Sequence, residues 1–471
     1  MFRNVILPLL SALCTATAAA QGDATARSID IEQVEIAASR PMKQIGVQRT
    51  LIDSTVLREN ITSSLADALT TGTTIFIKSY GRATLATASF SGTAPSHTQV
   101  TWNGMKINSP MLGQVDFSLI PSYFIDDAAV FHGASSVGIT GGGLGGAVTL
   151  KTSPPAEEGL SLRYVQGVGS FSTFDEFARL TWRGKRWSSS TRVLCSTSEN
   201  DFRYHNYNTK QFVTDENGNI VDSYYPLQRN RGGGFRDLHV MQALSSTTRG
   251  GDRLSLAAWY LDSHRGLAMT SAERNTDKQK RNTQDERTLR AVAAWQRLRG
   301  GLKTEVRGGY THTEMRYLMR VDVEGQGNFF SATDAQSRIR TLFAEAEAEY
   351  ALGERWLFTG SLSMHQHDTR TGDLSLIDYV TGQHADTLYR KQRFEASAFA
   401  AVKWRPRPRL GLAADLRWEL YGDRTTPLIP ALFADYLLSR RGNVVVKASA
   451  ARNYRFPTLN DLYFRPGRNP D

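Results

Sequence analysis

Apolar and polar residues alternate with a period of two along much of the chain after residue 156. The clearest stretch is Arg409 to Leu420, where the even-numbered positions are apolar and most odd-numbered positions are charged. Residues 342–350 repeat this pattern, and residues 302–310 and 444–451 follow it more loosely. Because successive side chains of a strand point to opposite faces, each stretch predicts a strand with one apolar and one polar face.

The lengths of the connections between these strands separate two kinds of β-protein. About thirteen strands are predicted, the last over residues 442–455, and the connections between them alternate in length. Short ones fall near 183–186, 248–252, 299–300, 351–353, 405–408 and 439–442, and long ones near 201–230, 264–285, 317–336 and 369–387. Two connections, near 169–172 and 421–426, are short where the alternation predicts a long one. Outer-membrane barrels have short turns on one side and long loops on the other, so the pattern favours a transmembrane antiparallel β-barrel.

The tryptophans of this region fit the same interpretation. Most sit near strand ends or on the apolar face, as an aromatic girdle at the membrane surface would: Trp182, Trp187, Trp259, Trp295, Trp356, Trp404 and Trp418. A soluble β-sandwich, with these tryptophans in an ordinary core, is the alternative.

The N-terminus predicts a secretory signal peptide over residues 1–20. Arg3 supplies the positive charge, Val5 to Leu13 form a short apolar run, and Ala18 to Ala20 fit a small-residue cleavage site. The apolar run is too short to span a membrane, so we expect export and removal of the signal.

Residues 46–153 predict a small α/β domain. A helix is expected over 63–69, with Ser63 or Ser64 as its cap and Gly72 at its end. Asn103-Gly104 is a strong hairpin signal between two short apolar runs. The predicted strands are 75–77, 98–102, 105–107, 127–131 and 147–151, and a further strand is predicted upstream over 31–38.

The glycine-rich stretch from Gly138 to Gly146 has the letters of a dinucleotide-binding fingerprint. That fingerprint requires a preceding strand and a following helix. Here a strand over 147–151 follows, so we reject a cofactor and expect a tight turn packed closely against other backbone.

Composition and charge exclude several other functions. The chain has 471 residues, a net charge of +10 and a negative mean hydropathy, which excludes a helical membrane bundle. With only two cysteines, the chain is not a disulfide scaffold and has no cysteine-based zinc site. It contains no run of five or more Lys or Arg, so nucleic-acid binding is not indicated. His365 and His367, with Asp368, could ligate a metal, but isolated strand histidines are usually structural, so no metal site is predicted. No catalytic residues stand out, and we expect no enzyme and no cofactor.

Taken together, several motifs resemble TonB-dependent outer-membrane receptors, most closely the cobalamin and ferric-siderophore receptor type. The segment similar to the TonB box is Glu32, Gln33, Val34, Glu35, Ile36, Ala37 and Ala38, followed by Ser39-Arg40. Segments similar to the plug domain are Ser64 to Leu69, Ser91 to Asn108, and Phe131 to Val148. The segment Tyr454 to Pro457, with Asp461 to Tyr463 and Asn469-Pro470, resembles a motif that the family carries partway around its barrel.

The resemblance implies a domain order and a set of partners. It implies a periplasmic extension over 21–45, a plug over 46–153 and a barrel over 154–471, with twenty-two strands in a complete barrel of the family. The implied partners are the periplasmic TonB protein with its ExbB/ExbD-type complex, outer-membrane lipid, a cobalamin or ferric-siderophore ligand and a surface lipoprotein. The expected function is active import of a scarce, large substrate; a receptor for glycan or peptide and a passive porin are the alternatives.

Ligand contacts are expected from two plug segments, Tyr80 to Thr87 and Ser109 to Asp116, and from the long loop near 201–230. Aromatic and arginine side chains suit a polar, partly apolar, anionic ligand. The candidate residues are Tyr80, Arg82, Asn108, Ser109, Gln114, Tyr204, Tyr207, Tyr224, Tyr225 and Arg229.

The chain also departs from the family pattern. Ser91 and His132 stand where the family usually has arginine, and Asn103 stands where it usually has aspartate. The chain stops at Asp471 inside the last motif, and the odd strand count would leave an open edge in lipid. We therefore expect a C-terminally truncated record that lacks about nine strands, roughly 200 residues.

Overall fold

The computed structural model describes residues 42–464, apart from residues 60, 140, 142, 231, 268–279, 323–328, 376–387 and 440–443. The described residues belong to one compact unit, Pro41–Asp471. The predicted signal peptide, the predicted strand and TonB box over 31–38, and Asn469-Pro470 lie outside the described residues.

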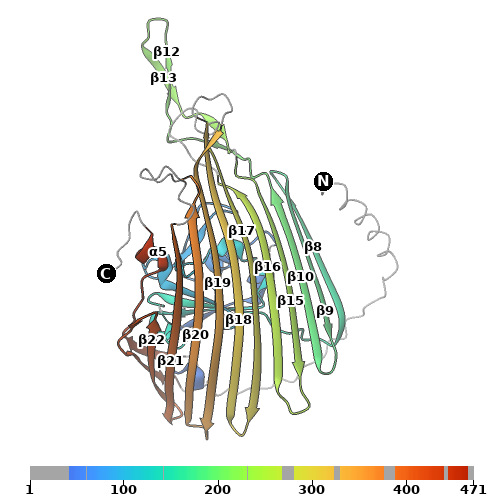
Figure 1. The fold of residues 1–471 in the computed structure, drawn as a ribbon, viewed down its shortest axis with the longest axis vertical. Coiled ribbons are helices and arrows are strands. Elements are labelled where there is room, and N and C mark those ends of the chain that lie inside the picture. The colour runs from blue at the N-terminus through green and yellow to red at the C-terminus, as the bar shows by residue number, and fades with distance from the viewer. Residues whose placement is uncertain are drawn as a thin grey trace. The chain divides into compact units, whose positions relative to one another are not determined.

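A large antiparallel sheet forms a curved wall (Figure 1). Thirteen strands follow one another in chain order along this sheet, and a short fourteenth, β23 (Arg424–Thr425), pairs only with β22. The thirteen are β8 (Gly159–Gly169), β9 (Thr173–Arg183), β10 (Trp187–Ser198), β15 (Phe235–Thr247), β16 (Arg253–Gly266), β17 (Lys280–Arg299), β18 (Leu302–Asp322), β19 (Phe329–Leu352), β20 (Trp356–Asp373), β21 (Tyr389–Arg407), β22 (Leu410–Tyr421), β24 (Ile429–Leu437) and β25 (Val445–Ala451). The predicted strand number is confirmed. Among the described residues, β8 and β25 are the two edges, so the wall is not closed.

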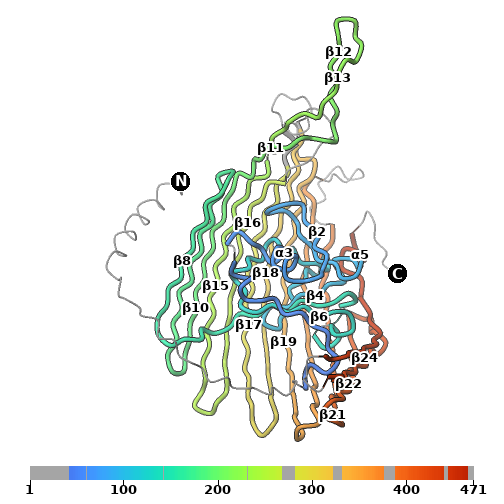
Figure 2. The backbone as a smooth tube through the Cα atoms, turned by 180° about the vertical axis from the view of Figure 1, so that it is seen from behind, coloured from blue at the N-terminus to red at the C-terminus, as the bar shows by residue number. Residues whose placement is uncertain are grey.

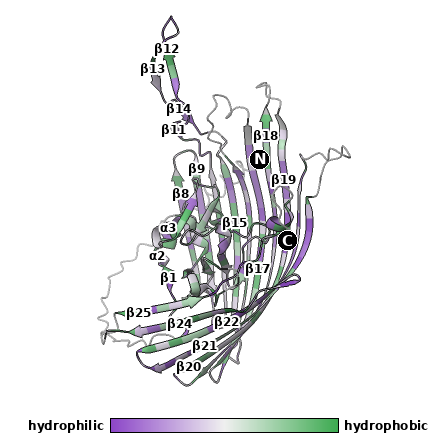
Figure 3. Cartoon of the chain, turned by 90° about the vertical axis from the view of Figure 1, so that its left-hand side faces the viewer, coloured by the Kyte–Doolittle hydropathy of each residue, from purple (hydrophilic) through white to green (hydrophobic). Residues whose placement is uncertain are grey.

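The wall buries its charged face and exposes its apolar face. In β22, Asp415, Arg417 and Glu419 are buried, whereas Leu416 and Trp418 are 42% and 37% exposed. A soluble sandwich would bury the apolar face, so this inverted burial is typical of a wall that faces lipid outside. The burial pattern therefore excludes the sandwich alternative. Figure 3 shows the hydropathy changing from residue to residue along the strands.

One tryptophan was assigned wrongly to the aromatic girdle. Trp182, Trp187, Trp356 and Trp404 are exposed or half-buried near the short turns, as the girdle predicts. Trp259 is fully buried instead, and its ring meets that of Trp102 at 5.6 Å. It faces inward because odd-numbered positions of β16 face the concave side of the wall.

A small α/β domain, the plug, lies against this concave side (Figure 2). Its sheet has the order β1-β6-β7-β4-β5, in which β4 and β7 run parallel. The strands are β1 (Arg49–Ile52), β4 (Thr98–Trp102), β5 (Met105–Lys106), β6 (Asp127–His132) and β7 (Gly146–Lys151), and β2 (Phe76–Ser79) and β3 (Ala86–Ser89) form a separate hairpin. The helices are α2 (Ser54–Arg58) and α3 (Leu65–Gly72), and short 3-10 turns include η1 (Met42–Gln44), η3 (Phe117–Leu119), η4 (Ser122–Phe124) and η5 (Gly133–Ser136).

Local sequence signals explain the plug elements that the sequence predicts. Ser64 caps α3, and Asp67 accepts a hydrogen bond from the Ser64 backbone N–H, which completes a capping box. Asn103 and Gly104 have φ angles of 48° and 86°, as a tight two-residue hairpin between β4 and β5 requires. The hairpin and the strands β4, β6 and β7 are confirmed within a residue or two of their expected bounds, and the helix is confirmed but ends three residues later than expected, at Gly72.

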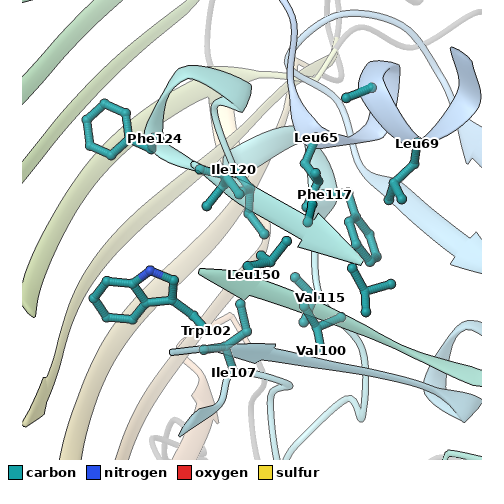
Figure 4. Packing of buried hydrophobic residues seen from close by; sticks show 14 of the residues in the cluster. Leu65, Leu69, Val100, Trp102, Ile107, Val115, Phe117, Ile120, Phe124 and Leu150 are labelled. Atoms are coloured by element: carbon teal, nitrogen blue, oxygen red, sulfur yellow. The ribbon is translucent and has the colours of Figure 1, made fainter. Parts of the chain in front are cut away.

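The plug and the wall share one hydrophobic core. Leu65, Val100 and Phe117 lie at its centre, and wall residues such as Trp259 and Phe177 belong to the same cluster. Figure 4 shows Trp102 and Phe124 at the side of this cluster that is nearest the wall. A plug packed in this way is part of the folded wall and not a loosely tethered domain.

Two expectations about the long connections need correction. The connection expected near 317–336 is mostly strand, since β18 ends at Asp322 and β19 begins at Phe329. The loop near 201–230 holds two short ladders, β11 (Arg203–His205) with β14 (Leu227–Arg229) and β12 (Gln211–Thr214) with β13 (Ile220–Tyr224). In both stretches apolar residues follow one another without alternation, as in Tyr317-Leu318-Met319 and Phe212-Val213, so the period-two signal is weak. Within the described part of the chain, no helix is long and apolar enough to cross a membrane.

Candidate functional site

Buried wall arginines hold the plug in place. Arg192 of β10 is fully buried and donates to Asp126 of the plug at 2.5 Å and to the Phe124 carbonyl at 2.8 Å. Arg179 of β9 reaches the other Asp126 oxygen at 3.1 Å, and Arg58 lies 3.7 Å from it. The Asp126 carboxylate therefore lies among three arginines, and it is the counter-charge of Arg192, the one that is fully buried and would be costly to leave unpaired.

A second group of ion pairs holds the plug surface on the side of the β2–β3 hairpin. Arg265 of β16 is 2% exposed and donates to Asp116 at 2.9 Å and to Ser118 at 3.1 Å. Arg82 reaches in the opposite direction, from the plug to Asp175 of β9, at 2.5 Å. A hollow of about 440 Å³ lies beside these contacts and is lined by Arg82, Ser118 and Asp175 among others.

The candidate ligand residues of the plug occupy different environments. Tyr80 is 66% exposed, and Ser109 and Gln114 are half-buried at a turn. Arg82 is engaged with the wall as just described. Asn108 is buried: its side chain accepts from the Val100 N–H and donates to two plug carbonyls, so its amide supports the plug backbone. A ligand role for these residues stays a prediction.

The candidate residues of the long loop gather on its two ladders. The Tyr207 and Tyr225 rings meet edge to face at 5.1 Å, and Tyr207 is 73% exposed. Tyr224 donates to Gln211 across β12 and β13 at 2.7 Å, and Tyr204 donates to Gln228 across β11 and β14 at 3.3 Å. Arg229 pairs with Asp201.

Sequence reasoning missed part of the aromatic surface at this loop. Phe202 lies between Phe171 and Tyr204, with ring distances of 6.1 and 6.2 Å, and His205 lies 6.4 Å from Tyr207. Phe171 comes from the turn between β8 and β9, thirty-one positions before Phe202. Only the local density of aromatic residues in 202–207 could have signalled this cluster.

A polar cavity of about 650 Å³ separates the plug from the wall near the short turns. Charged residues of both signs line its wall side: Lys303, Glu305, Arg307, Glu345, Glu347, Glu349 and Lys403. Arg307 joins this set by donating to Glu305 and Glu345, and its side chain lies against the plug turn at Gly104. Such a lining can hold water and a polar solute beside the plug.

Residues 42–47, which we call the wall anchor, attach the start of the plug to four wall strands, β19, β21, β24 and β25. Ile45 is fully buried beside Phe433, and Gly46 fits only because it lacks a side chain. The polar contacts are an ion pair of Lys43 with Glu349 and hydrogen bonds from Lys403 Nζ to the Lys43 carbonyl (2.8 Å), from the Gly46 N–H to Asp435 (3.1 Å) and from Lys447 Nζ to the Val47 carbonyl (2.7 Å).

His132, one of the departures from the family pattern, has contacts of its own within the plug. His132 bonds Thr50 at 2.9 Å and packs edge to face on Phe90, and burial lowers its pKa. The buried cation near the glycine-rich turn comes from the wall, because Arg417 donates to the Val137 carbonyl at 2.8 Å. The turn itself packs as expected: a side chain at Gly141 would collide with Glu419, and one at Gly146 with the Phe131 carbonyl.

The two strand histidines face the inside of the wall with stacked rings, centred 5.9 Å apart. His367 bonds Thr341 at 2.9 Å and lies 3.4 Å from Glu395. Asp368 lies on the opposite face of β20, because side chains alternate. Among the described residues, no group of three or more His, Cys, Asp or Glu could hold a metal ion.

Comparison with known proteins identifies the plug domain and the fold. Residues 41–147 match the TonB-dependent Receptor Plug Domain family. Solved structures of similar fold include the copper transporter OprC (15% identity, TM-score 0.64), a variant of the ferric enterobactin receptor PfeA from Pseudomonas aeruginosa (17%, 0.65) and the FrpB iron transporter from Neisseria meningitidis (13%, 0.66). They cover 88%, 89% and 88% of this chain, whereas 66%, 63% and 65% of their own lengths are matched. No curated protein sequence matches the chain.

These findings confirm the resemblance and the fold class that the sequence predicts. Residues 41–147 form a domain that matches the TonB-dependent receptor plug, and the plug and the wall together share the fold of these solved receptors and transporters. The chain spans about two thirds of the length of the solved receptors it resembles.

Proposed function

We propose that the protein imports a scarce, large substrate across the outer membrane by TonB-dependent active transport. The observation that carries this proposal is the buried clamp of Asp126 with Arg192 and Arg179. Removing the plug would expose the hydrophobic core that it shares with the wall and would separate Arg192 from Asp126, so its release costs free energy. Substrate passage therefore requires work on the plug.

For the cargo, we propose a ferric siderophore, with cobalamin as the alternative within the same class. PfeA is named as a ferric enterobactin receptor and FrpB as an iron transporter, and both share this fold. The loop ladders present tyrosines and arginines, which suit a ligand that is anionic outside and partly aromatic.

We propose that work is delivered through Glu32–Ala38, which would pair as an added strand with the periplasmic TonB protein. In this mode of binding, hydrogen bonds between the two backbones give the affinity. A proline in the segment would remove a backbone donor and disrupt the strand pairing. The wall anchor follows this segment by only a few residues and would bear the pull first. Energy would come from the ExbB/ExbD-type complex, and a surface lipoprotein could present cargo to the loops.

The test compares transport with binding in Ile36→Pro. We expect uptake of labelled ferric siderophore by iron-starved cells to fall at least tenfold, while binding to the same cells at 4 °C stays within twofold. Ala24→Pro, which places the same residue outside the segment, should transport normally. Normal uptake by Ile36→Pro would show that the segment is wrongly assigned, and loss of binding as well would point to misfolding.

A further inference from the structure

The hairpin of β12 and β13 projects beyond the wall on the side opposite the short turns (Figure 1). We call residues 210–224 the arm. Asn206 fixes the base of the arm: this residue is 2% exposed, and its side chain donates to Gln228 at 3.0 Å. Asp215 fixes the tip, because its carboxylate accepts from two backbone N–H groups of the turn, at 2.9 and 2.7 Å. The arm is therefore a defined element and not a loose loop.

The arm exposes apolar side chains on both of its faces. The exposed fractions are 53% for Phe212, 40% for Val213, 62% for Ile220, 61% for Val221 and 50% for Tyr224. Phe212 and Val213 are consecutive in β12, so they point to opposite faces. An isolated two-stranded hairpin is at best marginally stable in water, and exposed apolar clusters mark interaction sites. A strand added along one edge covers both faces, which a partner lying on a single face does not.

The two edges of the arm differ. Val213 opposes Asp222 and Thr214 opposes Ile220, so Val221 is an extra residue that forms a bulge in β13. A bulge and a nearby charge protect an edge from further pairing. Strand β12 has neither, and it contains no proline. In the described part of the chain, β12 pairs only with β13. Backbone N–H and C=O groups on the outer side of β12 are therefore open to another strand.

The charges at the two ends of β12 make its open edge complementary to a second copy of itself. Lys210 precedes the strand, and Asp215 and Glu216 follow it. Antiparallel pairing centred on Val213 places Lys210 of each copy opposite Glu216 of the other and sets the two Val213 side chains together. Opposite charges and apolar pairs across strands are stabilising, whereas like charges directly opposite are destabilising. Parallel pairing would place Lys210 against Lys210, so the charges select the antiparallel arrangement.

The direction of β12 decides where the second copy lies. This strand runs from the wall towards the tip of the arm (Figure 2), so all copies in one membrane present it in the same direction. Antiparallel pairing therefore needs a copy that faces the first from an apposed membrane. We propose that the arm joins two copies of this chain across two apposed membranes, by antiparallel pairing of β12 around a twofold axis. The proposal rests on a wall that spans a membrane, and it needs neither cargo nor the segment Glu32–Ala38.

The test uses outer-membrane vesicles from cells that produce the protein, in two populations with different fluorophores. Energy transfer between the populations measures clustering, and vesicles without the protein give the background. A single pairing is small, but many copies on each vesicle act together. We expect native vesicles to cluster and Val213→Lys to lower clustering at least tenfold, because it places like charges at the centre of the pair. Val221→Lys is the matched control: it adds the same charge to the protected strand β13 and should cluster like the native protein.

Exchanging the end charges tests the antiparallel arrangement itself. Vesicles that carry Lys210→Glu, or those that carry Glu216→Lys, should cluster at least tenfold less among themselves, because the ends that meet then have the same charge. A mixture of the two populations should recover most of the native clustering, since the charges that meet are again opposite.

Three results would overturn the proposal. They are equal losses in Val213→Lys and Val221→Lys, a mixture of the charge variants that clusters no better than its parts, and clustering that appears only after another surface protein is added. In the last case the edge of β12 would serve that protein and not a second copy. An unchanged melting temperature verifies that each variant is folded.

Discussion

Single residues hold the plug through charges whose partners are far apart in the chain. The sequence places Arg179 and Arg192 on the polar faces of strands, but it does not indicate that both meet Asp126, which lies 66 positions before Arg192. The family pattern has arginines at positions 91 and 132 of the plug, where this chain has none. At the glycine-rich turn the structure has a buried cation from the wall instead, since Arg417 donates to the Val137 carbonyl.

The Asp126 clamp should dominate the stability of the plug. In Asp126→Asn the fully buried Arg192 loses its counter-charge, which should lower the free energy of unfolding of the plug by about 3 kcal/mol. Scanning calorimetry of the purified protein would measure the change. Asp127→Asn is the control, because Asp127 is exposed and bonds only Ser153 among its described contacts, so its effect should stay below about 0.5 kcal/mol.

Plug stability should fall in mild acid because of His132. Burial lowers the pKa of His132 below its ordinary value of 6.5, so the unfolded chain takes up a proton before the folded plug does. Stability is therefore fully present above pH 6.5 and declines as the pH falls towards the folded pKa, by less than about 1.4 kcal/mol per pH unit for this one group.

Urea unfolding between pH 7.5 and 5 would measure this decline in the native protein and in His132→Gln, which keeps a partner for Thr50. The variant should show a shallower decline. Burial and the nearby Arg455 also lower the pKa of His97, so some pH dependence of stability should remain in the variant. A variant with an unchanged pH profile would assign the whole effect to other groups.

At the scale of elements, local signals predicted well where one face is apolar. The capped helix α3, the Asn103-Gly104 turn and strands such as β22 follow from residues close in sequence. The upper parts of β18 and β19 did not, because apolar and polar residues do not alternate there, as in Tyr317 to Arg320. Strand β1 was missed because Arg49 to Ile52 gains its order by pairing with β6, about eighty residues away.

The wall anchor gives an element-scale prediction. Gly46 has a φ of 62°, and a side chain there would lie 2.5 Å from the Phe433 side chain and 3.0 Å from the Ala434 backbone. In Gly46→Ala we expect residues 42–47 to detach, so that trypsin cleaves after Lys43 at least tenfold faster. Gly353→Ala is matched in backbone conformation, with a φ of 58° and open space around it, and should leave this cleavage rate unchanged.

At the scale of the whole molecule, the sequence predicts the fold class: a β-barrel wall with an apolar outer face and a plug domain inside it. The alternation of apolar and polar residues, the alternation of short and long connections, and the order of the plug motifs each indicate this architecture. The ligand site was less predictable, since Asn108 and Arg82 have structural contacts while Tyr80 and the loop tyrosines remain exposed. Sequence patterns report which face a residue occupies, but not which distant groups share that face.

The central claim is that the plug closes the passage until work displaces it. Electrical conductance of single molecules, purified from outer membranes and inserted in a planar bilayer, tests it most directly. We predict no open-channel current at rest, and reversible large steps only when urea unfolds the plug. Steady conductance with the plug folded would contradict the account and favour a passive pore.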